Sequence, residues 1–320
     1  MEKKIKINYS IDKDNCAPCT LKNNKKSKFK TCYSKESLIK IASIWNKNNS
    51  EKENIKVEKS SKKQLWISIQ KKLKMICDKD EYCWKKQDFI KKIQDIDIEQ
   101  YTFKPSYPKA WLKDNHTWLN TYDIYYVMKQ YEKANNDFVF MGPIPSDCPT
   151  KIHCELSKLD LINMKKKGIF KVGIVYNLDT SDQPGSHWTA IYIDNKNNEI
   201  NYYDSYGTQS VPLINKFMLQ LTEQYRKHNI EPIIIYNDKR HQYGGSECGM
   251  YSMNFILERL HGTTMYQISK MKIPDSKMTY LRKLLYNIKI YKKPNSKTDS
   301  KLNSKKYSKE HTKNKIEKKI

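Results

Sequence analysis

HQYGGSECGMYSMNFILERLHG, residues 241–262, places Cys248 between a glycine-rich turn and a stretch with the apolar spacing of a helix. The N-terminus of a helix presents unpaired N–H groups and the positive end of the helix dipole, which favour the thiolate form of a cysteine placed there. Gly244, Gly245 and Gly249 leave room for an extended peptide to approach the sulfur. A glycine turn before a helix is common, so this stretch alone does not separate a reactive cysteine from a structural one.

A nucleophilic thiol needs a base and a group that orients the base. His187 opens the stretch HWTAIYID, and Asp204 lies near the end of the next one, EINYYDS. β-Branched and aromatic residues dominate both stretches, which predicts strands over 187–194 and 199–205 joined by a turn. The pattern does not decide whether the two side chains meet. A histidine at a strand edge can be an ordinary surface residue, and an aspartate before Ser-Tyr-Gly can simply form a turn.

Acyl transfer also needs a hydrogen-bond donor aimed at the developing oxyanion. Gln242, six residues before Cys248, can offer its side-chain amide beside the backbone N–H of that cysteine. Taken alone, Gln242 can equally be a polar loop residue. His187, Asp204, Gln242 and Cys248 are each ambiguous, but together in one chain they favour a thiol protease site.

Other patterns predict the elements around this site. They are a short strand running into a proline-rich turn over 137–148, strands over 170–178 and 232–238, and helices over 118–134 and 210–228. Helix 210–228 joins the strand that contains Asp204 to the last strand. This combination predicts an α+β fold, a central sheet with helices packed on it.

Lysine-rich segments flank the predicted sheet domain. Residues 1–105 contain two amphipathic helical patterns, at 34–47 and 65–93, and the prolines of FKPSYPKAW mark the boundary to the domain at 106–291. The tail 292–320 has eleven lysines, three acids and almost no large apolar residues, so it is predicted to be disordered.

The formal net charge of +25 is compatible with an anionic partner such as nucleic acid or a packed virion interior. Alternatively, an AT-rich coding sequence scatters lysine over every solvated surface. The basic tail can bind DNA or RNA non-specifically, but it lacks the interleaved aromatic residues of a base-stacking surface. The chain begins without an apolar run, and no segment reaches ~18 apolar residues, so we expect a soluble, non-secreted protein without membrane contact.

Eight cysteines in a reducing compartment are more often metal ligands, catalytic groups or buried residues than disulfides. Cys16 and Cys19 form a Cys-x-x-Cys motif with Cys32 thirteen residues on, but a zinc site needs four ligands and no second pair follows. Cys77 and Cys83 lie within a helical pattern and are expected to pack in a core. We therefore expect no metal and no cofactor.

The order His187, Asp204, Gln242, Cys248 resembles the ubiquitin-like-protein-specific cysteine peptidases, the SUMO protease and adenain-like family. The intervals agree, with seventeen residues from histidine to aspartate and six from glutamine to cysteine. In that family His-Trp opens a strand, an Asp-Ser pair closes the next, and Gln…Cys-Gly opens the central helix. WLNTYDIYYVMKQYE is similar to the family's first peptidase helix, and the resemblance covers roughly residues 111–265.

Three further pieces, CYSKESLIKIASIWN, CDKDEYCW and FMGPIPSDC, resemble the branch from large nucleocytoplasmic DNA viruses, typified by the African swine fever virus polyprotein protease. The resemblance implies a papain-like cysteine peptidase fold with circularly shifted catalytic order, plus an N-terminal helical region. It also implies cleavage after small residues, often at a Gly-Gly-containing site, and packaging in the virion.

The resemblance further implies a role for each residue. Cys248 is the expected nucleophile, His187 its general base and later acid, Asp204 the group that orients the imidazolium, and Gln242 part of the oxyanion hole. Trp188 is expected to line a narrow slot over the substrate's terminal glycines, although it can also be a core aromatic residue.

The favoured function is therefore a cysteine endopeptidase that cleaves viral structural polyproteins at Gly-Gly-type sites, located in the virion and, before packaging, in the host cytoplasm. One alternative is a deubiquitinating or deSUMOylating protease that acts on host conjugates. A second alternative is an inactive nucleic-acid-binding virion scaffold, but a purely structural role does not require all four site residues.

Overall fold

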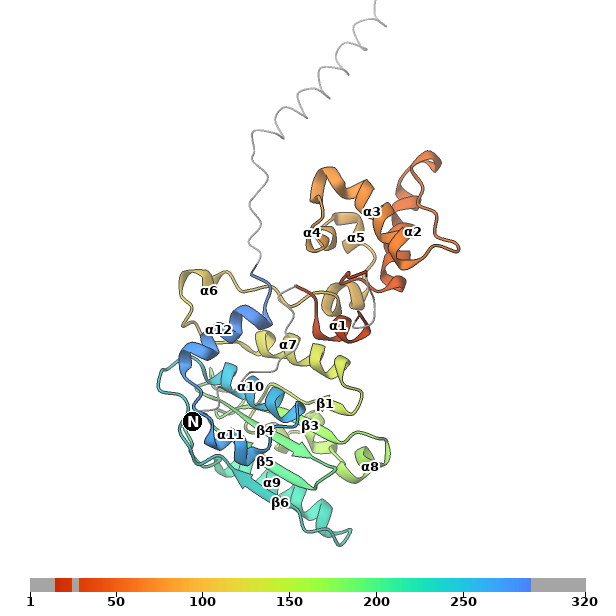
Figure 1. Cartoon of the computed structure of the whole chain (residues 1–320). Helices are drawn as coiled ribbons and strands as arrows, with labels where there is room; N and C mark the ends of the chain where they lie inside the picture. Colours follow the sequence, from red (N-terminus) through yellow and green to blue (C-terminus); the bar gives the residue numbers. More distant parts are fainter. Residues whose placement is uncertain (1–14, 25–28, 289–320) are drawn as a thin grey trace, which may run out of the picture. The chain divides into compact units, whose positions relative to one another are not determined.

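A mixed six-stranded sheet forms the middle layer of the part of the chain after residue 105 in the computed structural model, which describes residues 15–24 and 29–288 (Figure 1). Its strands are β1 (Phe138–Phe140), β2 (Ile144–Pro145), β3 (Lys171–Asn177), β4 (Trp188–Asp194), β5 (Glu199–Tyr203) and β6 (Ile233–Tyr236). The order across the sheet is β1-β3-β4-β5-β6, and β2 also pairs with β3. The pairs β3–β4 and β4–β5 are antiparallel, whereas β1 and β2 run parallel to β3 and β6 runs parallel to β5.

Alternate side chains of the central strands enter two separate cores. On β4, Ala190 and Tyr192 belong to one core, and Ile191 and Ile193 belong to the other. A strand that is buried on both faces has an almost continuous apolar sequence. This burial explains why WTAIYID lacks the alternation of apolar and polar residues that is typical of a strand with one solvent-exposed face.

Helices cover both faces of the sheet, as predicted for an α+β fold (Figure 1). The helices after the first hundred residues are α6 (Ala110–Lys113), α7 (Thr121–Ala134), α8 (Leu161–Lys166), α9 (Pro212–Arg226), α10 (Cys248–Leu260), α11 (Met265–Lys270) and α12 (Asp275–Leu285), with single 3₁₀ turns at Cys148–Thr150 and Glu155–Lys158. Side chains of α7, α10, α11 and α12 fill one core, and those of α8 and α9 fill the other. In α10 every residue from Cys248 to Arg259 is buried, so it is the central helix.

The lysine-rich N-terminal region is helical, as its patterns predict. Its elements are α1 (Pro18–Asn24), α2 (Lys35–Asn48), a 3₁₀ turn (Glu51–Glu53), α3 (Lys62–Cys77), α4 (Glu81–Lys85), α5 (Asp88–Lys91) and a π-helical turn (Asp97–Tyr101). The pattern over 65–93 is not one helix. Asp78, with a positive φ of 47°, ends α3, and the Asp80 carboxylate accepts the Tyr82 N–H to begin α4.

A buried amide joins this region to the first long helix of the sheet domain. Gln130 on α7 donates to the carbonyl oxygens of Gln100, at 2.6 Å, and Phe103, at 2.8 Å. The described residues up to Asn287 belong to one compact unit, and the domain boundary at residue 105 stays a prediction. The tail 292–320 lies outside the described residues.

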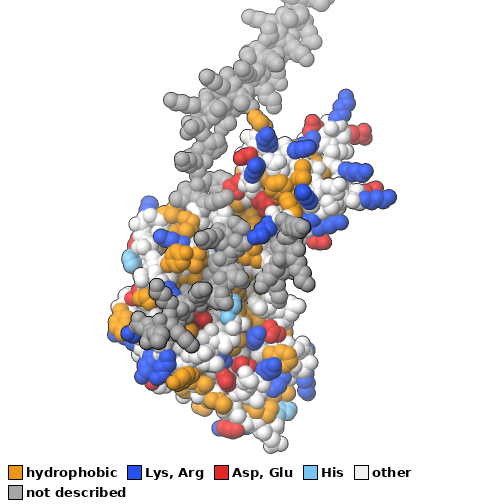
Figure 2. Space-filling model, viewed as in Figure 1, with side chains coloured by type: hydrophobic (Ala, Val, Ile, Leu, Met, Phe, Trp, Pro, Cys, Tyr) orange, Lys and Arg blue, Asp and Glu red, His pale blue; other side chains and the backbone are white. Residues whose placement is uncertain are grey.

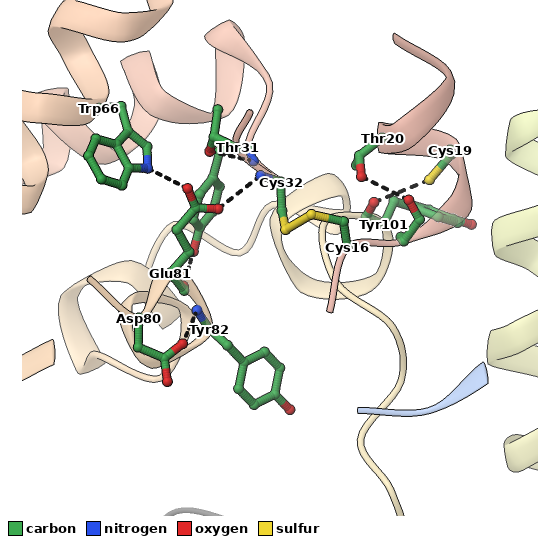
Figure 3. Close-up of a disulfide and its surroundings, with 12 residues drawn as sticks. Cys16, Cys19, Thr20, Thr31, Cys32, Trp66, Asp80, Glu81, Tyr82 and Tyr101 are labelled. Carbon is green, nitrogen blue, oxygen red and sulfur yellow. Dashed lines mark hydrogen bonds between the residues drawn. A yellow bond between two sulfur atoms is a disulfide. The ribbon is translucent and has the colours of Figure 1, made fainter. Parts of the chain in front are cut away.

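The expectation of reduced cysteines is wrong for six of the eight. Disulfides join Cys16 to Cys32, Cys77 to Cys83, and Cys148 to Cys154. Figure 3 shows the first of these bonds, beside the Cys32 N–H that donates to Glu81 at 2.9 Å. The turn between α3 and α4 brings the Cα atoms of Cys77 and Cys83 to 5.4 Å, a proximity that a helical pattern does not predict.

Candidate active site

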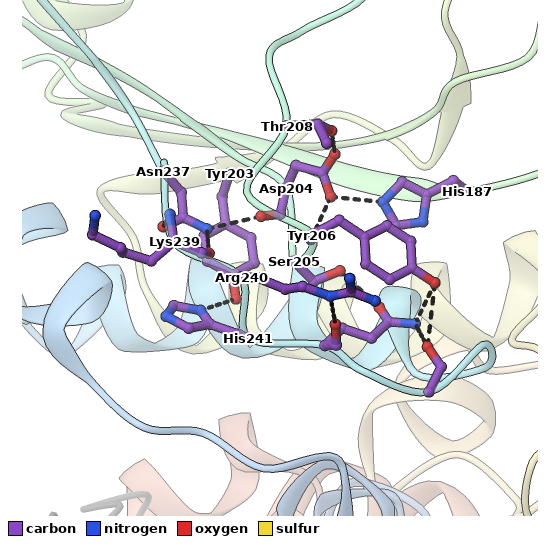
Figure 4. A network of polar contacts seen from close by, with 12 residues as sticks. His187, Tyr203, Asp204, Ser205, Tyr206, Thr208, Asn237, Lys239, Arg240 and His241 are labelled. Carbon is purple, nitrogen blue, oxygen red and sulfur yellow. Dashed lines mark hydrogen bonds and ion pairs between the residues drawn. The ribbon is translucent and has the colours of Figure 1, made fainter.

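The β4–β5 hairpin brings His187 and Asp204 together. Ala190 pairs with Tyr203, so the residues just before β4 lie beside the residues just after β5. The Nε2 atom of His187 lies 2.8 Å from Oδ1 of Asp204 (Figure 4). The sequence pattern left this contact open, and the antiparallel direction of the two strands decides it.

Asp204 is buried and surrounded by donors. Its carboxylate accepts hydrogen bonds from the Thr208 hydroxyl and, at 2.8 Å, from the Tyr206 N–H, in addition to the His187 contact. Its carbonyl oxygen accepts from the Asn237 amide at 2.8 Å. Burial raises the pKa of the carboxyl, but the hydrogen bond and the charge of His187 outweigh this effect and hold the pKa below its usual value. Asp204 is therefore an anion at neutral pH.

Cys248 is the first residue of α10, as predicted, and its side chain also contacts His187. Because Asp204 occupies Nε2, the other ring nitrogen is left for the sulfur. Burial lowers the pKa of His187, but the hydrogen bonds to Asp204 and Cys248 outweigh it and raise the pKa from 6.5 to about 9. At neutral pH this arrangement favours an imidazolium beside the sulfur, which is the state of an activated thiol.

The loop before Cys248 is anchored to α12. The Asp275 carboxylate accepts from the backbone N–H groups of Tyr243, at 3.1 Å, and Gly244, at 2.8 Å. Arg282, which is fully buried, donates to the Glu247 carboxylate at 3.1 Å and to the Ser246 carbonyl at 3.2 Å. Sequence reasoning missed both anchors, because an aspartate and an arginine in a charged C-terminal helix carry no local signal.

Gln242 is fully buried, and each end of its amide has partners. Its oxygen accepts from the Ser205 hydroxyl at 2.7 Å, and its nitrogen donates to the Gly244 carbonyl at 2.7 Å and to the Tyr206 hydroxyl at 3.2 Å. Both amide hydrogens are therefore engaged. Donation to a substrate oxyanion requires one of these two bonds to break.

Trp188 is buried, and its indole N–H donates to the Leu119 carbonyl at 3.0 Å. A Cβ atom at Gly249 would lie 3.2 Å from this indole, so that glycine serves the packing of α10 against Trp188. At Gly245 a Cβ would meet nothing within 4 Å, and at Gly244 the nearest atom would be 3.4 Å away. Gly245 therefore faces open space, whereas Gly244 lies against the Asp275 carboxylate, and the contact of either glycine with a substrate stays a prediction.

A pocket of about 480 Å³ lies where β3 ends and β4 begins. Its lining includes Trp118, Leu119, Pro145, Asn177, Gly185 and Trp188. A second pocket of about 430 Å³ shares Thr121, Pro143 and Ile144 with the first. Trp118, with 48% of its surface exposed, is a residue that sequence reasoning missed, although it opens the quoted stretch WLNTYDIYYVMKQYE.

The sequence predicts no bound metal and no contact with a membrane. Within residues 15–24 and 29–288 no group of three or more His, Cys, Asp or Glu side chains has the arrangement of a metal site. Over the same described ranges, no helix combines the length and the apolar character that crossing a membrane requires.

Comparison with known proteins identifies relatives of both the sequence and the fold. Residues 155–296 match the Ulp1 protease family, C-terminal catalytic domain. The chain is 31% identical over 251 residues to "Putative thiol protease R355" of Acanthamoeba polyphaga mimivirus, covering 72% of this chain and 81% of that protein. It is 26% identical over 255 residues to a SUMO-1 cysteine protease of African swine fever virus (isolate Pig/Kenya/KEN-50/1950), covering 72% and 91%.

A solved structure has a similar fold. The crystal structure of the selenomethionine form of an African swine fever virus protease superposes with a TM-score of 0.60 at 20% sequence identity, covering 87% of this chain and 99% of that one. The likeness extends through the N-terminal helices as well as the sheet domain, because it spans most of both chains.

Proposed function

The chain belongs to the Ulp1 protease family and is a cysteine protease, and from that premise we propose that it cleaves viral structural polyproteins at Gly-Gly-type sites during virion maturation. The observation that carries this proposal is the contact of His187 with both Asp204 and Cys248. The relatives from mimivirus and African swine fever virus support a viral setting. We further propose that the enzyme lies in the host cytoplasm before packaging and in the virion afterwards.

The proposed reaction proceeds through a thioester. The Cys248 sulfur attacks the carbonyl carbon of the scissile peptide bond, and the oxygen of that carbonyl takes the negative charge. The oxyanion accepts from the backbone N–H of Cys248 and from one Gln242 N–H that exchanges its present partner. His187 protonates the leaving amine, and the C–N bond breaks.

Water then releases the acyl half of the substrate, which is the second product. His187, now neutral, takes a proton from a water molecule that attacks the thioester, and the carboxylic acid product leaves with the sulfur restored. Throughout the cycle Asp204 keeps the imidazole oriented through the 2.8 Å contact to Nε2. No cofactor is part of this scheme.

The pocket beside Trp188 supports the proposed preference for small residues. Trp118 and Trp188 line the same pocket, together with Pro184 and Gly185. Flat aromatic side chains favour glycine beside them, because a substrate segment without side chains can lie close to the rings. We propose that the residues before the scissile bond lie here.

A weak contact with nucleic acid is also part of the proposal. Lysine and arginine side chains are scattered over the face shown in Figure 2, with aspartate and glutamate side chains among them. Such a surface, in a chain of net charge +25, supports non-specific and salt-dependent contact with DNA or RNA.

A second candidate function is deconjugation of ubiquitin or a SUMO-like modifier from host proteins. The observation in its favour is the name of the African swine fever virus relative, a SUMO-1 cysteine protease. The chemistry is the same, and the two functions differ in whether the bond cut lies in a polyprotein chain or at the terminus of a modifier.

The test uses the wild-type protein and a Cys248→Ala variant with two substrates. One is a capsid-precursor peptide that contains Gly-Gly, and the other is a ubiquitin-like modifier with a fluorogenic C-terminal amide. Peptide cleavage by the wild type alone supports the maturation protease. Release from the modifier alone supports the deconjugase, and inactivity on both substrates, across the salt and DNA concentrations tested, contradicts both.

A further inference from the structure

Tyr206 contacts three of the four proposed catalytic residues. Its ring stacks on the His187 imidazole, with centroids 4.8 Å apart and an interplanar angle of 19° (Figure 4). Its backbone N–H donates to the same Asp204 oxygen that His187 contacts. Its hydroxyl accepts from Gln242 at 3.2 Å and donates to the Gly244 carbonyl at 3.2 Å.

The turn after β5 determines where this side chain lies. Asp204 accepts the Tyr206 N–H two residues on, a local bond by which aspartate forms a turn. Gly207 follows with a φ of +74°, and a Cβ there would lie 2.8 Å from the carbonyl carbon of Lys239. The turn therefore lies close against the chain at Lys239, which leads into the Gln242 loop.

We propose that Tyr206 is a positioning residue whose ring holds the His187 imidazole against Asp204 and Cys248 and whose hydroxyl holds the Gln242 amide. This inference rests on the proposed function. The hydroxyl bond to Gln242 is 3.2 Å long, whereas the bond from Gln242 to Gly244 is 2.7 Å. When the oxyanion forms, Gln242 gives up the longer bond, to Tyr206, and donates to the oxyanion instead. Until then the Tyr206 hydroxyl keeps the Gln242 amide oriented.

The charged and titratable groups around the ring pair come from several elements. They are Asp204 just after β5, Cys248 on α10, Arg240 in the loop before Gln242, and Asp275 on α12. The Arg240 guanidinium lies 5.2 Å from the Tyr206 ring centroid and also contacts the ring of Tyr243. The ring thus contacts both the His187 imidazolium and the Arg240 guanidinium, and both cations favour an electron-rich aromatic at this position.

Two substitutions separate the ring from the hydroxyl. Tyr206→Phe keeps the stack and removes the bond to Gln242, whereas Tyr206→Leu removes both. Tyr206 is partly exposed, so neither change leaves a large cavity. Tyr266→Leu on α11 is the matched control, because that tyrosine is 71% exposed and its ring contacts Lys270.

Steady-state hydrolysis of the better substrate is measured over a range of pH. We expect Tyr206→Phe to lower kcat by up to ~10-fold with KM unchanged, because the Gln242 amide is no longer held in place before the oxyanion forms. We expect Tyr206→Leu to lower kcat by about a further ~10-fold, the effect of one aromatic contact. An unchanged kcat in Tyr206→Leu, or an equal loss in the control, overturns the inference.

The position of the imidazole is also measured without turnover, by following the His187 ring protons in NMR spectra as the pH changes. The contacts with Asp204 and Cys248 raise the pKa of His187 to about 9, so a loosened ring in Tyr206→Leu titrates closer to 6.5. Tyr206→Phe and the control are expected to titrate like the wild type, and an unmoved midpoint in Tyr206→Leu overturns the proposal. If the wild type hydrolyses neither substrate, the proposed function fails, and this titration still decides the role of Tyr206.

Discussion

Cys19 and Cys248, the two cysteines outside disulfides, are both buried and both stand in the first turn of a helix, yet their surroundings differ. The Cys19 thiol donates to the Tyr101 carbonyl at 3.2 Å (Figure 3). Burial raises the pKa of Cys19 to about 11, and the charge of Lys133 only partly offsets it. Cys248 instead contacts an imidazole held by a carboxylate. Burial at the start of a helix is therefore not sufficient to make a cysteine a nucleophile. The difference lies in the imidazole beside Cys248 and the carboxylate that holds that imidazole.

Exchange of each free cysteine for alanine gives the largest expected difference. Cys248→Ala is expected to abolish hydrolysis, because no other described thiol contacts His187, and Cys19→Ala is expected to keep wild-type activity. Product formation from the fluorogenic modifier and the Gly-Gly peptide measures both. Equal loss of activity in the two variants would remove the distinction between the sites, provided thermal unfolding shows that both fold.

Alkylation compares the two thiols in one molecule. At pH 7.5 we expect iodoacetamide to modify Cys19 much more slowly than Cys248, because only the thiolate reacts and, at a pKa of about 11, fewer than one Cys19 thiol in ~10³ is ionised. Mass spectrometry of digested peptides measures each rate. The Cys19 rate should rise as the pH approaches 11, and comparable rates at pH 7.5 would contradict the comparison.

Asp204→Ala tests whether the carboxylate of Asp204 is the feature that distinguishes the surroundings of Cys248 from those of Cys19. We expect kcat/KM to fall by roughly 10²- to 10³-fold, because the imidazole loses its orienting partner. His187 is protonated below a pKa of about 9 in the wild type, so activity should decline as the pH rises through 9. Without Asp204 this decline should begin at lower pH. A pH–rate profile that matches the wild type would mean that Asp204 does not set the charge of His187.

Gln242→Ala gives the smallest of these expected effects. Loss of one oxyanion donor lowers kcat by about 10²-fold, while the thiol and imidazole stay in place. The alkylation rate of Cys248 is therefore expected to stay close to that of the wild type in this variant, which separates an effect on the oxyanion from an effect on the thiol. An unchanged kcat would assign Gln242 to the loop structure held by Ser205 and Gly244.

Local sequence patterns were sufficient for several features. The strands over 170–178, 187–194 and 199–205 and the helix that begins at Cys248 are present as predicted, because each depends on the side chains of its own segment. The sequence also showed the residue types that thiol chemistry needs, because a cysteine, a histidine, an aspartate and a glutamine can be recognised without knowing the fold. The split of 65–93 into separate helices was missed, since one positive φ at Asp78 interrupts an otherwise continuous pattern.

Contacts between distant segments required the tertiary structure. The pairing of Cys16 with Cys32, the anchoring of the Gln242 loop by Arg282, and the stack of Tyr206 on His187 join segments whose sequences carry no signal of each other. By itself the sequence determined which side chains can do the chemistry. Only the tertiary structure decided which of them meet, because strand direction, helix packing and burial place atoms within hydrogen-bond distance irrespective of their spacing along the chain.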